Sequence, residues 1–316
     1  MSYRDVSEHQ WMIADRARTG AYEAAIRASV RPGDVVMDFG CGLGILAMFA
    51  ARAGARKVYA VDRLPIVRLA QAVARTNGLT GIDFVHAPDA PFSLPEKVDV
   101  IVSEWMGHLA LHEGMLGPLC AARDAHLAPG GRMIPGRVTL RAALVSERSY
   151  HEKRDYFSTR PYGIDFSPVA HWVFSEVSGE RFATAHLLAP AVTIATLDMA
   201  TIAGPPPFVE AEIEPAGAAE VVGIAGWFEA DLGGGVTLDT GPSAPATHWS
   251  QLFFPFAEPW PVHPSRTVRV RLTPVQVDEV HTRWQWWAGD GETERSGDDL
   301  TLLAYLRRPL PAGILK

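Results

Sequence analysis

The chain has 316 residues, of which 47% are hydrophobic and 21% are charged. It is long and apolar enough to form two domains with buried cores, and this composition excludes a disordered or low-complexity chain. The net charge of −7 argues against binding to nucleic acid or to an anionic membrane surface.

The cysteine content and the polar N-terminal residues indicate in which cellular compartment the protein is found. The two cysteines, Cys41 and Cys120, form no CxxC pair, so we predict neither a disulfide framework nor a metal site. The first eleven residues are polar, and no apolar run reaches the roughly 18–20 residues that span a bilayer. We therefore expect a cytoplasmic protein. The abundance of Ala, Arg, Gly and Pro over Lys and Asn indicates a GC-rich bacterial source.

The first half of the chain alternates between short apolar runs and amphipathic stretches. An N-terminal segment, residues 1–30, precedes this pattern, and residues 10–29 of it are predicted to be helical. Over residues 31–135 the order of elements is βαβα, which predicts a parallel, Rossmann-like sheet with helices on both faces. The predicted strands are 35–39, 57–62 and 98–102, and the predicted helices are 45–53 and 65–77.

The composition changes after Pro129-Gly130-Gly131, where the apolar runs become short, β-branched or aromatic. We predict that residues 136–316 form a second, mostly β domain, a barrel or a sandwich. Its clearest strands are 138–140, 221–224, 252–254, 268–272 and 284–287, and its clearest loops are the proline run 205–207 and the glycine run 233–235.

A glycine-rich loop, Gly40-Cys41-Gly42-Leu43-Gly44, follows the first strand and opens a helix. Its glycines allow the backbone to pass close beneath a ligand. Asp62, 22 positions after Gly40, ends the second strand, where a carboxylate can accept hydrogen bonds from ribose hydroxyls. The dinucleotide fingerprint needs a third glycine where this chain has Ile45. These features favour S-adenosylmethionine, which has a ribose but no phosphate, over a dinucleotide or an ordinary glycine turn.

Two glutamates follow the third apolar strand. Glu104 lies in Ser103–Gly107, and Glu113 follows nine residues later. A continuous helix would place these side chains on opposite faces, so only a loop can bring them together. Paired carboxylates repel unless a cation lies between them, and a planar guanidinium suits such a gap. The alternative is two unrelated surface glutamates, but the neighbouring tryptophan and methionines argue against a solvated face.

The chain resembles the protein arginine methyltransferase family in four segments. These segments have the family's order and spacing, and the resemblance is most specific between Tyr3 and about Pro135. It implies a Rossmann-like cofactor domain, then a β-barrel substrate domain with a dimerisation arm at about 151–190, and hence a homodimer. The segments are His9-x-x-Met12-x-x-Asp15-x-x-Arg18-x-x-x-Tyr22, Asp38-x-Gly40-Cys41-Gly42-Leu43-Gly44-Ile45-Leu46, Ser103–Gly107 with Glu113-x-Met115-Leu116, and Thr247-His248-Trp249.

The resemblance also implies roles for individual residues. Arg18 would pair with the cofactor carboxylate, Asp62 would hold the ribose and Asp89 the adenine amino group. The remaining residues of the cofactor site would be His9, Met12, Asp38, Gly40, Gly42 and Gly44. Glu104 and Glu113 would grip the substrate guanidinium, His248 would pair with Asp15, and Tyr3, Met115 and Trp249 would complete the substrate site.

This sequence departs from the family pattern in several places. Leu43 stands where threonine is usual, Asp62 where glutamate is usual, and His108 where tyrosine is common. Only two residues precede Tyr3, so we expect the helix that extends the family's lid to be nearly absent.

The short N-terminus and the indicated bacterial source favour free L-arginine as the acceptor, with Nω-methyl-L-arginine as the main product. Proteins similar to this family methylate free arginine in bacterial specialised metabolism, as in the streptozotocin pathway. The alternative acceptor is arginine in Gly/Arg-rich protein segments. A methyltransferase for another amine and an inactive binding scaffold are the rival functions, but a scaffold would be expected to lack the intact glycine loop or one glutamate.

Overall fold

The computed structural model describes residues 5–88, 91–278, 282–301 and 304. The chain divides into two compact units. Unit 1 contains the chain up to residue 140 together with 196–205 and 228–250, and unit 2 contains 141–195, 206–227 and the chain from 251 onward. This division differs from the predicted boundary at 135/136 because two later segments of the chain belong to unit 1.

Unit 1 begins with two helices, α1 (Val6–Ala14) and α2 (Arg16–Ser29), where the sequence predicted one segment. The break falls at Asp15, whose backbone is extended. The Asp15 side chain accepts a hydrogen bond from the Arg18 backbone N–H at 3.0 Å, which caps the first turn of α2. Tyr22, Ala25 and Ile26 lie on the buried face of α2, as expected from their helical spacing.

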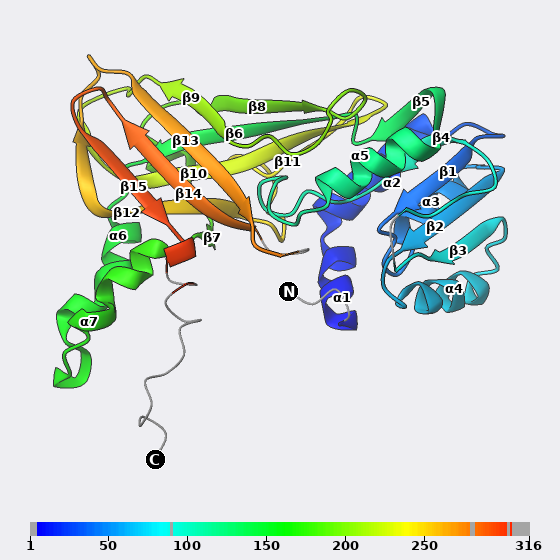
Figure 1. Ribbon diagram of the computed structural model, residues 1–316, viewed down its shortest axis with the longest axis horizontal. Coiled ribbons are helices and arrows are strands. Elements are labelled where there is room, and N and C mark those ends of the chain that lie inside the picture. The colour runs from blue at the N-terminus through cyan, green and yellow to red at the C-terminus, as the bar shows by residue number, and fades with distance from the viewer. Residues whose placement is uncertain (1–4, 89–90, 279–281, 302–303, 305–316) are drawn as a thin grey trace. The chain divides into compact units, whose positions relative to one another are not determined.

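The centre of unit 1 is a five-stranded sheet in the order β3-β2-β1-β4-β5, and all its strand pairings are parallel. The three predicted strands have their predicted bounds, while β3, β5 and the helix between β4 and β5 were not predicted. Figure 1 shows the strands in blue and green with their connecting helices. The strands are β1 (Val35–Phe39), β2 (Lys57–Asp62), β3 (Ile82–His86), β4 (Val98–Val102) and β5 (Leu127–Ile134), and the helices are α3 (Ile45–Arg52), α4 (Val67–Thr76) and α5 (Leu116–His126).

Strands β1 and β4 are neighbours, so the loops that follow them start side by side. Val102, the last residue of β4, pairs with Asp38 near the end of β1. The Ser103 hydroxyl then donates to the Phe39 carbonyl at 2.7 Å and ties the two loops together. The sheet order reverses at β1, and open α/β sheets bind ligands beyond the carboxyl ends of their strands at such a point.

A hairpin from the later part of the chain completes unit 1. Strands β10 (Ala219–Gly233) and β11 (Val236–Asp239) are joined by Gly234 and Gly235, which both have positive φ. The predicted loop at 233–235 is therefore a two-residue turn, with Gly233 inside the strand. A Cβ on Gly234 would lie 2.5 Å from the Ala28 Cβ, so the turn packs closely against α2.

The other strands lie in two further sheets, ordered β7-β12-β10-β6-β8, with β11 also paired to β10, and β15-β14-β13-β9. The pairs of β12 with β7 and β10, and all pairs of the second of these sheets, are antiparallel. The five strands predicted for this half fall within β6, β10, β12, β13 and β14. In unit 2, Val145, Phe182, Trp227 and Phe253 belong to one buried cluster. The strands not yet described are β6 (Arg137–Val145), β7 (Ser178–Glu180), β8 (Val192–Asp198), β9 (Val209–Ile213), β12 (Gln251–Val262), β13 (Val268–Gln276), β14 (Thr282–Gly289) and β15 (Glu294–Asp298).

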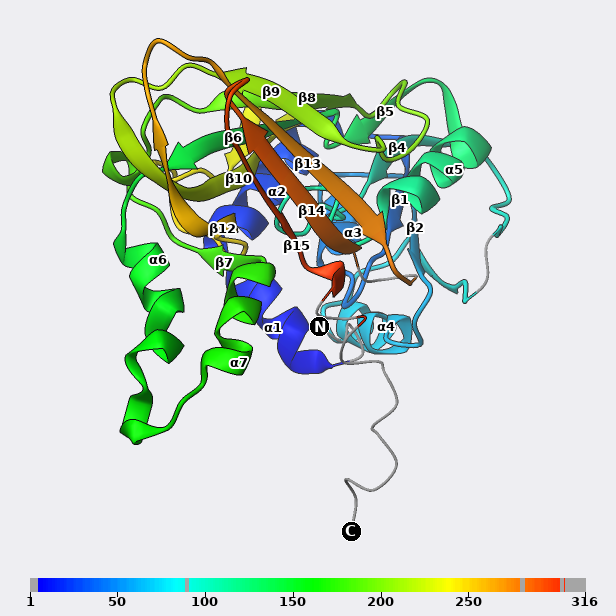
Figure 2. The same cartoon turned by 60° about the vertical axis from the view of Figure 1, so that its left-hand side comes forward.

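Unit 2 also carries a helical arm, residues 149–175, which projects away from its strands (Figure 2). The arm lies within the predicted arm region of about 151–190. At its base, the Arg154 guanidinium donates to the Val173 carbonyl and to the Ser178 hydroxyl. The arm contains α6 (Ser149–Arg154), η1 (Asp155–Thr159), η2 (Pro161–Gly163), α7 (Ser167–Ala170) and η3 (His171–Ser175), and η4 (Thr184–His186) follows it. Across the described ranges, no helix combines the length and the apolar character needed to cross a bilayer.

Candidate active site

The glycine loop between β1 and α3 depends on backbone conformations that favour glycine. Gly40, Gly42 and Gly44 have φ values of 75°, 52° and 79°. A Cβ on Gly42 would lie 2.7 Å from His9 Cε1, and one on Gly40 would lie 3.1 Å from Met115 Cε. The structure therefore brings His9 and Met115 against this loop, and a side chain at Gly42 would have to displace the His9 ring.

Asp62 lies at the end of β2 and faces the same loop. Its Oδ2 accepts a hydrogen bond from the Gly42 N–H at 2.8 Å, and its Oδ1 accepts one from the Leu64 N–H at 2.7 Å. The residue is only 8% exposed. Each carboxylate oxygen has a second lone pair, so Asp62 can hold the loop and also accept hydrogen bonds from hydroxyl groups.

Asp38, in β1, is fully buried beneath the loop. Its Oδ2 accepts a hydrogen bond from the Ala47 N–H at 2.8 Å, while its buried Oδ1 has no hydrogen-bond partner among the described residues. Burial, together with the charge of Asp62, raises the pKa of Asp38 to about 7 against the opposing effect of the Ala47 hydrogen bond. An unpaired carboxylate oxygen suits a cationic group. Ribose hydroxyl acceptors, an acceptor for an ammonium group and a cradle of glycines together fit S-adenosylmethionine.

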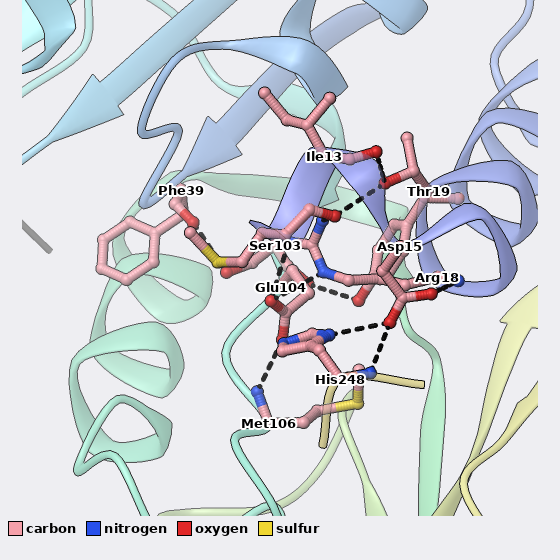
Figure 3. Close-up of polar contacts among 11 residues, drawn as sticks. Ile13, Asp15, Arg18, Thr19, Phe39, Ser103, Glu104, Met106 and His248 are labelled. Carbon is pink, nitrogen blue, oxygen red and sulfur yellow. Dashed lines mark hydrogen bonds and ion pairs between the residues drawn. The ribbon is translucent and has the colours of Figure 1, made fainter. Parts of the chain in front are cut away.

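Arg18 and Glu104 form a buried ion pair, shown in Figure 3. Arg18 Nε and Nη2 both donate to Glu104 Oε2, at 3.1 and 2.8 Å. The remaining terminal nitrogen, Nη1, donates to the Met12 carbonyl at 3.2 Å. Burial alone would lower the pKa of Arg18, but the Glu104 charge more than offsets it, so the pKa is raised and Arg18 stays protonated. The sequence predicted Arg18 for the cofactor and Glu104 for the substrate, and it did not predict that they bind each other.

The two glutamates lie on one non-helical segment between β4 and α5, so a loop carries both, as their spacing required. Glu104 Oε1 accepts a hydrogen bond from the Met106 N–H at 3.1 Å. Gly107 has a φ of 51°, and a Cβ placed on it would lie 2.8 Å from Glu113 Cγ. The segment therefore folds back on itself. The Glu113 side chain packs against Gly107, which lies three residues after Glu104.

His248 and Asp15 are brought together from opposite ends of the sequence (Figure 3). The His248 backbone N–H donates to Asp15 Oδ2 at 2.8 Å, and the His248 Nδ1 lies 2.8 Å from the same oxygen. Burial raises the pKa of Asp15, but hydrogen bonds from Arg18 and His248 outweigh it, and the pKa is lowered. Trp249 is 2% exposed, and its ring centroid lies 6.0 Å from the Arg18 guanidinium carbon. This arrangement holds the His248 backbone and ring on Asp15.

Two histidines near the glutamates extend the predicted site. His108 and His112 have ring centroids 5.7 Å apart in an edge-to-face arrangement. Burial, with smaller contributions from His112 and His248, lowers the pKa of His108 to about 4, so His108 is neutral at neutral pH. The sequence singled out His108 only as a departure from the family pattern and missed His112, although it directly precedes Glu113.

Two predicted residues, Tyr3 and Asp89, lie outside the described residues, so their predicted roles remain predictions. In the ranges that the structure does describe, no group of three His, Cys, Asp or Glu residues is arranged to hold a metal ion.

Comparisons with known proteins identify methyltransferases over most of the chain. The profile described as "Arginine methyltransferase oligomerization subdomain" matches residues 136–285, and that of the ribosomal protein L11 methyltransferase matches residues 21–135. A probable protein arginine N-methyltransferase 6 from Arabidopsis thaliana is 32% identical, over 88% of this chain and 75% of the relative. Protein arginine N-methyltransferase 1 from Schizosaccharomyces pombe is 34% identical, over 80% of this chain and 77% of the relative.

The comparison with solved structures also identifies arginine methyltransferases. The solved Trypanosoma brucei PRMT1 enzyme-prozyme heterotetrameric complex with AdoHcy superposes with a TM-score of 0.83 and 27% identity, and the match covers 94% of this chain and 99% of that one. This similarity confirms the predicted Rossmann-like domain followed by a β-barrel-like domain. The chain belongs to the protein arginine methyltransferase family, whose enzymes use S-adenosylmethionine as the methyl donor.

Proposed function

We propose that this chain transfers a methyl group from S-adenosylmethionine to a guanidino nitrogen of arginine in proteins. The observation that carries the proposal is that Glu104, on the same loop as Glu113, holds a guanidinium group inside the site, that of Arg18. Glu104 therefore has the chemistry and the placement to accept hydrogen bonds from a guanidinium, the functional group of the proposed acceptor. The neighbouring glycine loop, with Asp38 and Asp62, has the groups that the donor requires.

The cofactor would be held by groups of complementary chemistry. Arg18 would bind its carboxylate, Asp38 its ammonium group through Oδ1, and Asp62 its ribose hydroxyls. The backbone of Gly40, Gly42 and Gly44 would pass beneath it, with His9, Met12 and Met115 alongside. When bound, the cofactor supplies an electrophilic methyl group on a sulfonium.

The two glutamates have to make a poor nucleophile reactive. Free arginine has a pKa above about 12, so its guanidinium carries a delocalised positive charge. Carboxylates on one edge of the guanidinium draw that charge away from the nitrogen on the other edge. They would also orient that nitrogen toward the methyl group that the bound cofactor supplies. The proton released from the methylated nitrogen passes to a glutamate oxygen.

The relatives favour protein arginine over the free L-arginine expected from the sequence, because the curated relatives described above are named protein arginine N-methyltransferases. The net charge of −7 would also attract cationic Gly/Arg-rich segments. Incubation with the cofactor and equal concentrations of L-arginine and a Gly/Arg-rich peptide, followed by mass spectrometry, tests the choice. We expect methylated peptide, whereas conversion of L-arginine alone to Nω-methyl-L-arginine would establish free arginine as the acceptor.

We also propose a homodimer assembled through the helical arm. The oligomerization profile spans the arm, and three apolar side chains near its tip, Tyr156, Tyr162 and Ile164, are exposed by 53, 96 and 57%. Light scattering at micromolar concentration should give twice the chain mass of 34.4 kDa. The substitutions Tyr162→Ser and Ile164→Ser should weaken the dimer. Leu69→Ser, which removes an exposed apolar side chain from α4 outside the arm, is the control. A single 34.4 kDa species for the unmodified chain contradicts the proposal.

A cytoplasmic location remains part of the proposal. Both cysteines are buried and unpaired, which is compatible with a reducing compartment. Cell fractionation with a tagged full chain tests this location, and recovery outside the cytoplasmic fraction would overturn it.

A further inference from the structure

The Arg18–Glu104 ion pair joins a residue of the cofactor site to a residue of the acceptor site. Both side chains are almost fully buried, with exposed fractions of 6% for Arg18 and 9% for Glu104. Solvent and salt therefore screen the pair weakly. Any ligand that takes charge from Arg18 changes how strongly Glu104 attracts a guanidinium, and the reverse also holds.

The geometry of Arg18 leaves room for a second carboxylate. A guanidinium has five N–H donors in one plane. The bonds to Glu104 and to the Met12 carbonyl use the Nε hydrogen and one hydrogen on each terminal nitrogen. Among the described residues, one N–H on Nη1 and one on Nη2 are therefore left for a further acceptor, while the edge that carries Nε is bound to Glu104.

The contacts of Glu104 indicate that the ion pair weakens its attraction for an acceptor guanidinium. Its Oε2 receives both Arg18 hydrogen bonds, and its Oε1 receives the Met106 N–H. In this state the Glu104 charge is largely offset by Arg18, so an incoming guanidinium gains less from it. A cofactor carboxylate bound to the other edge of Arg18 would weaken the attraction between Arg18 and Glu104. Glu104 would then attract the acceptor guanidinium more strongly.

We propose that Arg18 is a positioning residue that couples the two sites, so that the cofactor carboxylate and the acceptor guanidinium bind cooperatively through the Arg18–Glu104 pair. The proposal rests on the proposed function and adds to it an energetic link between donor and acceptor. Linkage is reciprocal: each ligand tightens the other by the same factor. Couplings of this kind typically amount to about 5–150-fold.

The first test uses the unmodified full chain. Calorimetry measures the affinity of a Gly/Arg-rich peptide with and without saturating S-adenosylhomocysteine, which keeps the carboxylate and ammonium groups but lacks the reactive methyl. We expect the peptide to bind at least tenfold more tightly when S-adenosylhomocysteine is present. Equal peptide affinity in both conditions overturns the proposal.

The second test needs no acceptor. Glu104→Gln removes the charge that competes for Arg18, so we expect S-adenosylhomocysteine to bind at least fivefold more tightly than to the unmodified chain. Glu113→Gln removes the same charge from the same loop and serves as the matched control, with an expected change below about twofold, well under the lower end of typical coupling. An ordinary structural role for the ion pair predicts weaker binding in Glu104→Gln. That result, or equal effects of both variants, contradicts the proposal.

Failure of this inference is distinguishable from failure of the proposed function. Methyl transfer to the peptide by the unmodified chain establishes the function regardless of coupling. If transfer occurs and S-adenosylhomocysteine leaves peptide affinity unchanged, only the coupling is wrong. If neither acceptor is methylated, the proposed function fails, and the S-adenosylhomocysteine affinities of the two glutamine variants still decide whether Glu104 controls Arg18. Thermal unfolding of each variant establishes that it is folded before its affinity is interpreted.

Discussion

The glycine loop and the glutamate loop start from adjacent strands, yet they are built in different ways. The glycine loop takes its shape from the backbone, since it depends on three positive φ angles and on an N–H bound by Asp62. The glutamate loop places its functional groups through side chains, with Glu104 held by Arg18 and Glu113 packed against Gly107. In the proposed function the glycine loop is the donor end of the site and should be sensitive to added volume, whereas the glutamate loop is the acceptor end and should be sensitive to lost charge.

The largest effect should come from removing charge at the acceptor end. We expect Glu104→Gln and Glu113→Gln each to lower kcat/KM for methyl transfer by about 100-fold or more, since losing one charged group at a transition state typically costs about 2.7–4 kcal/mol. Steady-state kinetics with the peptide measures this effect. Near-normal turnover in both variants would show that the two carboxylates do not hold the acceptor.

The next effect should come from added volume at the donor end. We expect Gly42→Ala to weaken S-adenosylhomocysteine binding about tenfold, because the left-handed conformation costs about 1–2 kcal/mol with a side chain and the new Cβ would lie 2.7 Å from the His9 ring. Gly20→Ala, at an exposed position of α2 where an added Cβ would have no neighbour within 4 Å, is the matched control. It should stabilise the fold by about 0.5–1 kcal/mol. Calorimetry and thermal unfolding measure both, and unchanged binding in Gly42→Ala would contradict the close backbone approach.

A smaller effect should follow from the buried charge of Asp38. Its pKa of about 7 in the cofactor-free protein means that acidification below pH 7 protonates Asp38 and removes the partner of the cofactor ammonium group. S-adenosylhomocysteine should therefore bind more weakly at pH 6 than at pH 8, and Asp38→Asn should bind weakly at both. Because the pKa of Asp38 is about 7 in the folded chain and 3.8 in the unfolded chain, the contribution of Asp38 to the free energy of unfolding is fully present below pH 3.8. This contribution is lost as the pH rises through about 7. Asp38→Asn should gain thermal stability relative to the unmodified chain at pH 8, and a pH-independent difference would contradict this assignment.

The smallest effect should come from Asp15. Its lowered pKa contributes stability that is present above the ordinary value of 3.8 and is lost as the pH falls through the lower folded value. Asp15→Asn retains the helix cap but not the charge, so the unmodified chain should be more stable at pH 6. Melting temperatures should converge as the pH falls toward 3. A gap that stays constant over this range would show that the Asp15 charge does not stabilise the fold.

Local patterns were enough to predict the parts of the structure that local interactions determine. Strands β1, β2 and β4 have their predicted bounds because continuous apolar runs bury both faces. Strand β3 was missed because its side chains are only partly buried and give no such run. Strand β5 was missed because it contains Pro129-Gly130-Gly131, which is typical of a loop, and the helical segment breaks at Asp15 because its side chain caps α2.

The candidate site was predictable as a set of residues but not as a set of contacts. Residue type and spacing indicated a guanidinium between carboxylates, and the resemblance supplied the roles of Arg18 and Glu104. These two residues are 86 positions apart, and nothing in the spacing indicates that they bind each other. The tertiary structure brings them together, because β4 places Glu104 at the carboxyl end of the sheet and the buried face of α2 carries Arg18.

The distance in sequence between Asp15 and His248 has a consequence for synthesis of the chain. The partners are 233 residues apart, so at the usual rate of about 5–20 residues per second, His248 emerges about 10–50 s after Asp15. During that interval α2 can cap itself through Asp15, but His248 and the hairpin of β10 and β11 have not yet been made. The nascent chain therefore lacks the His248 partner of Asp15 until residue 248 has been translated, and a fragment that ends at residue 140 would lack it permanently.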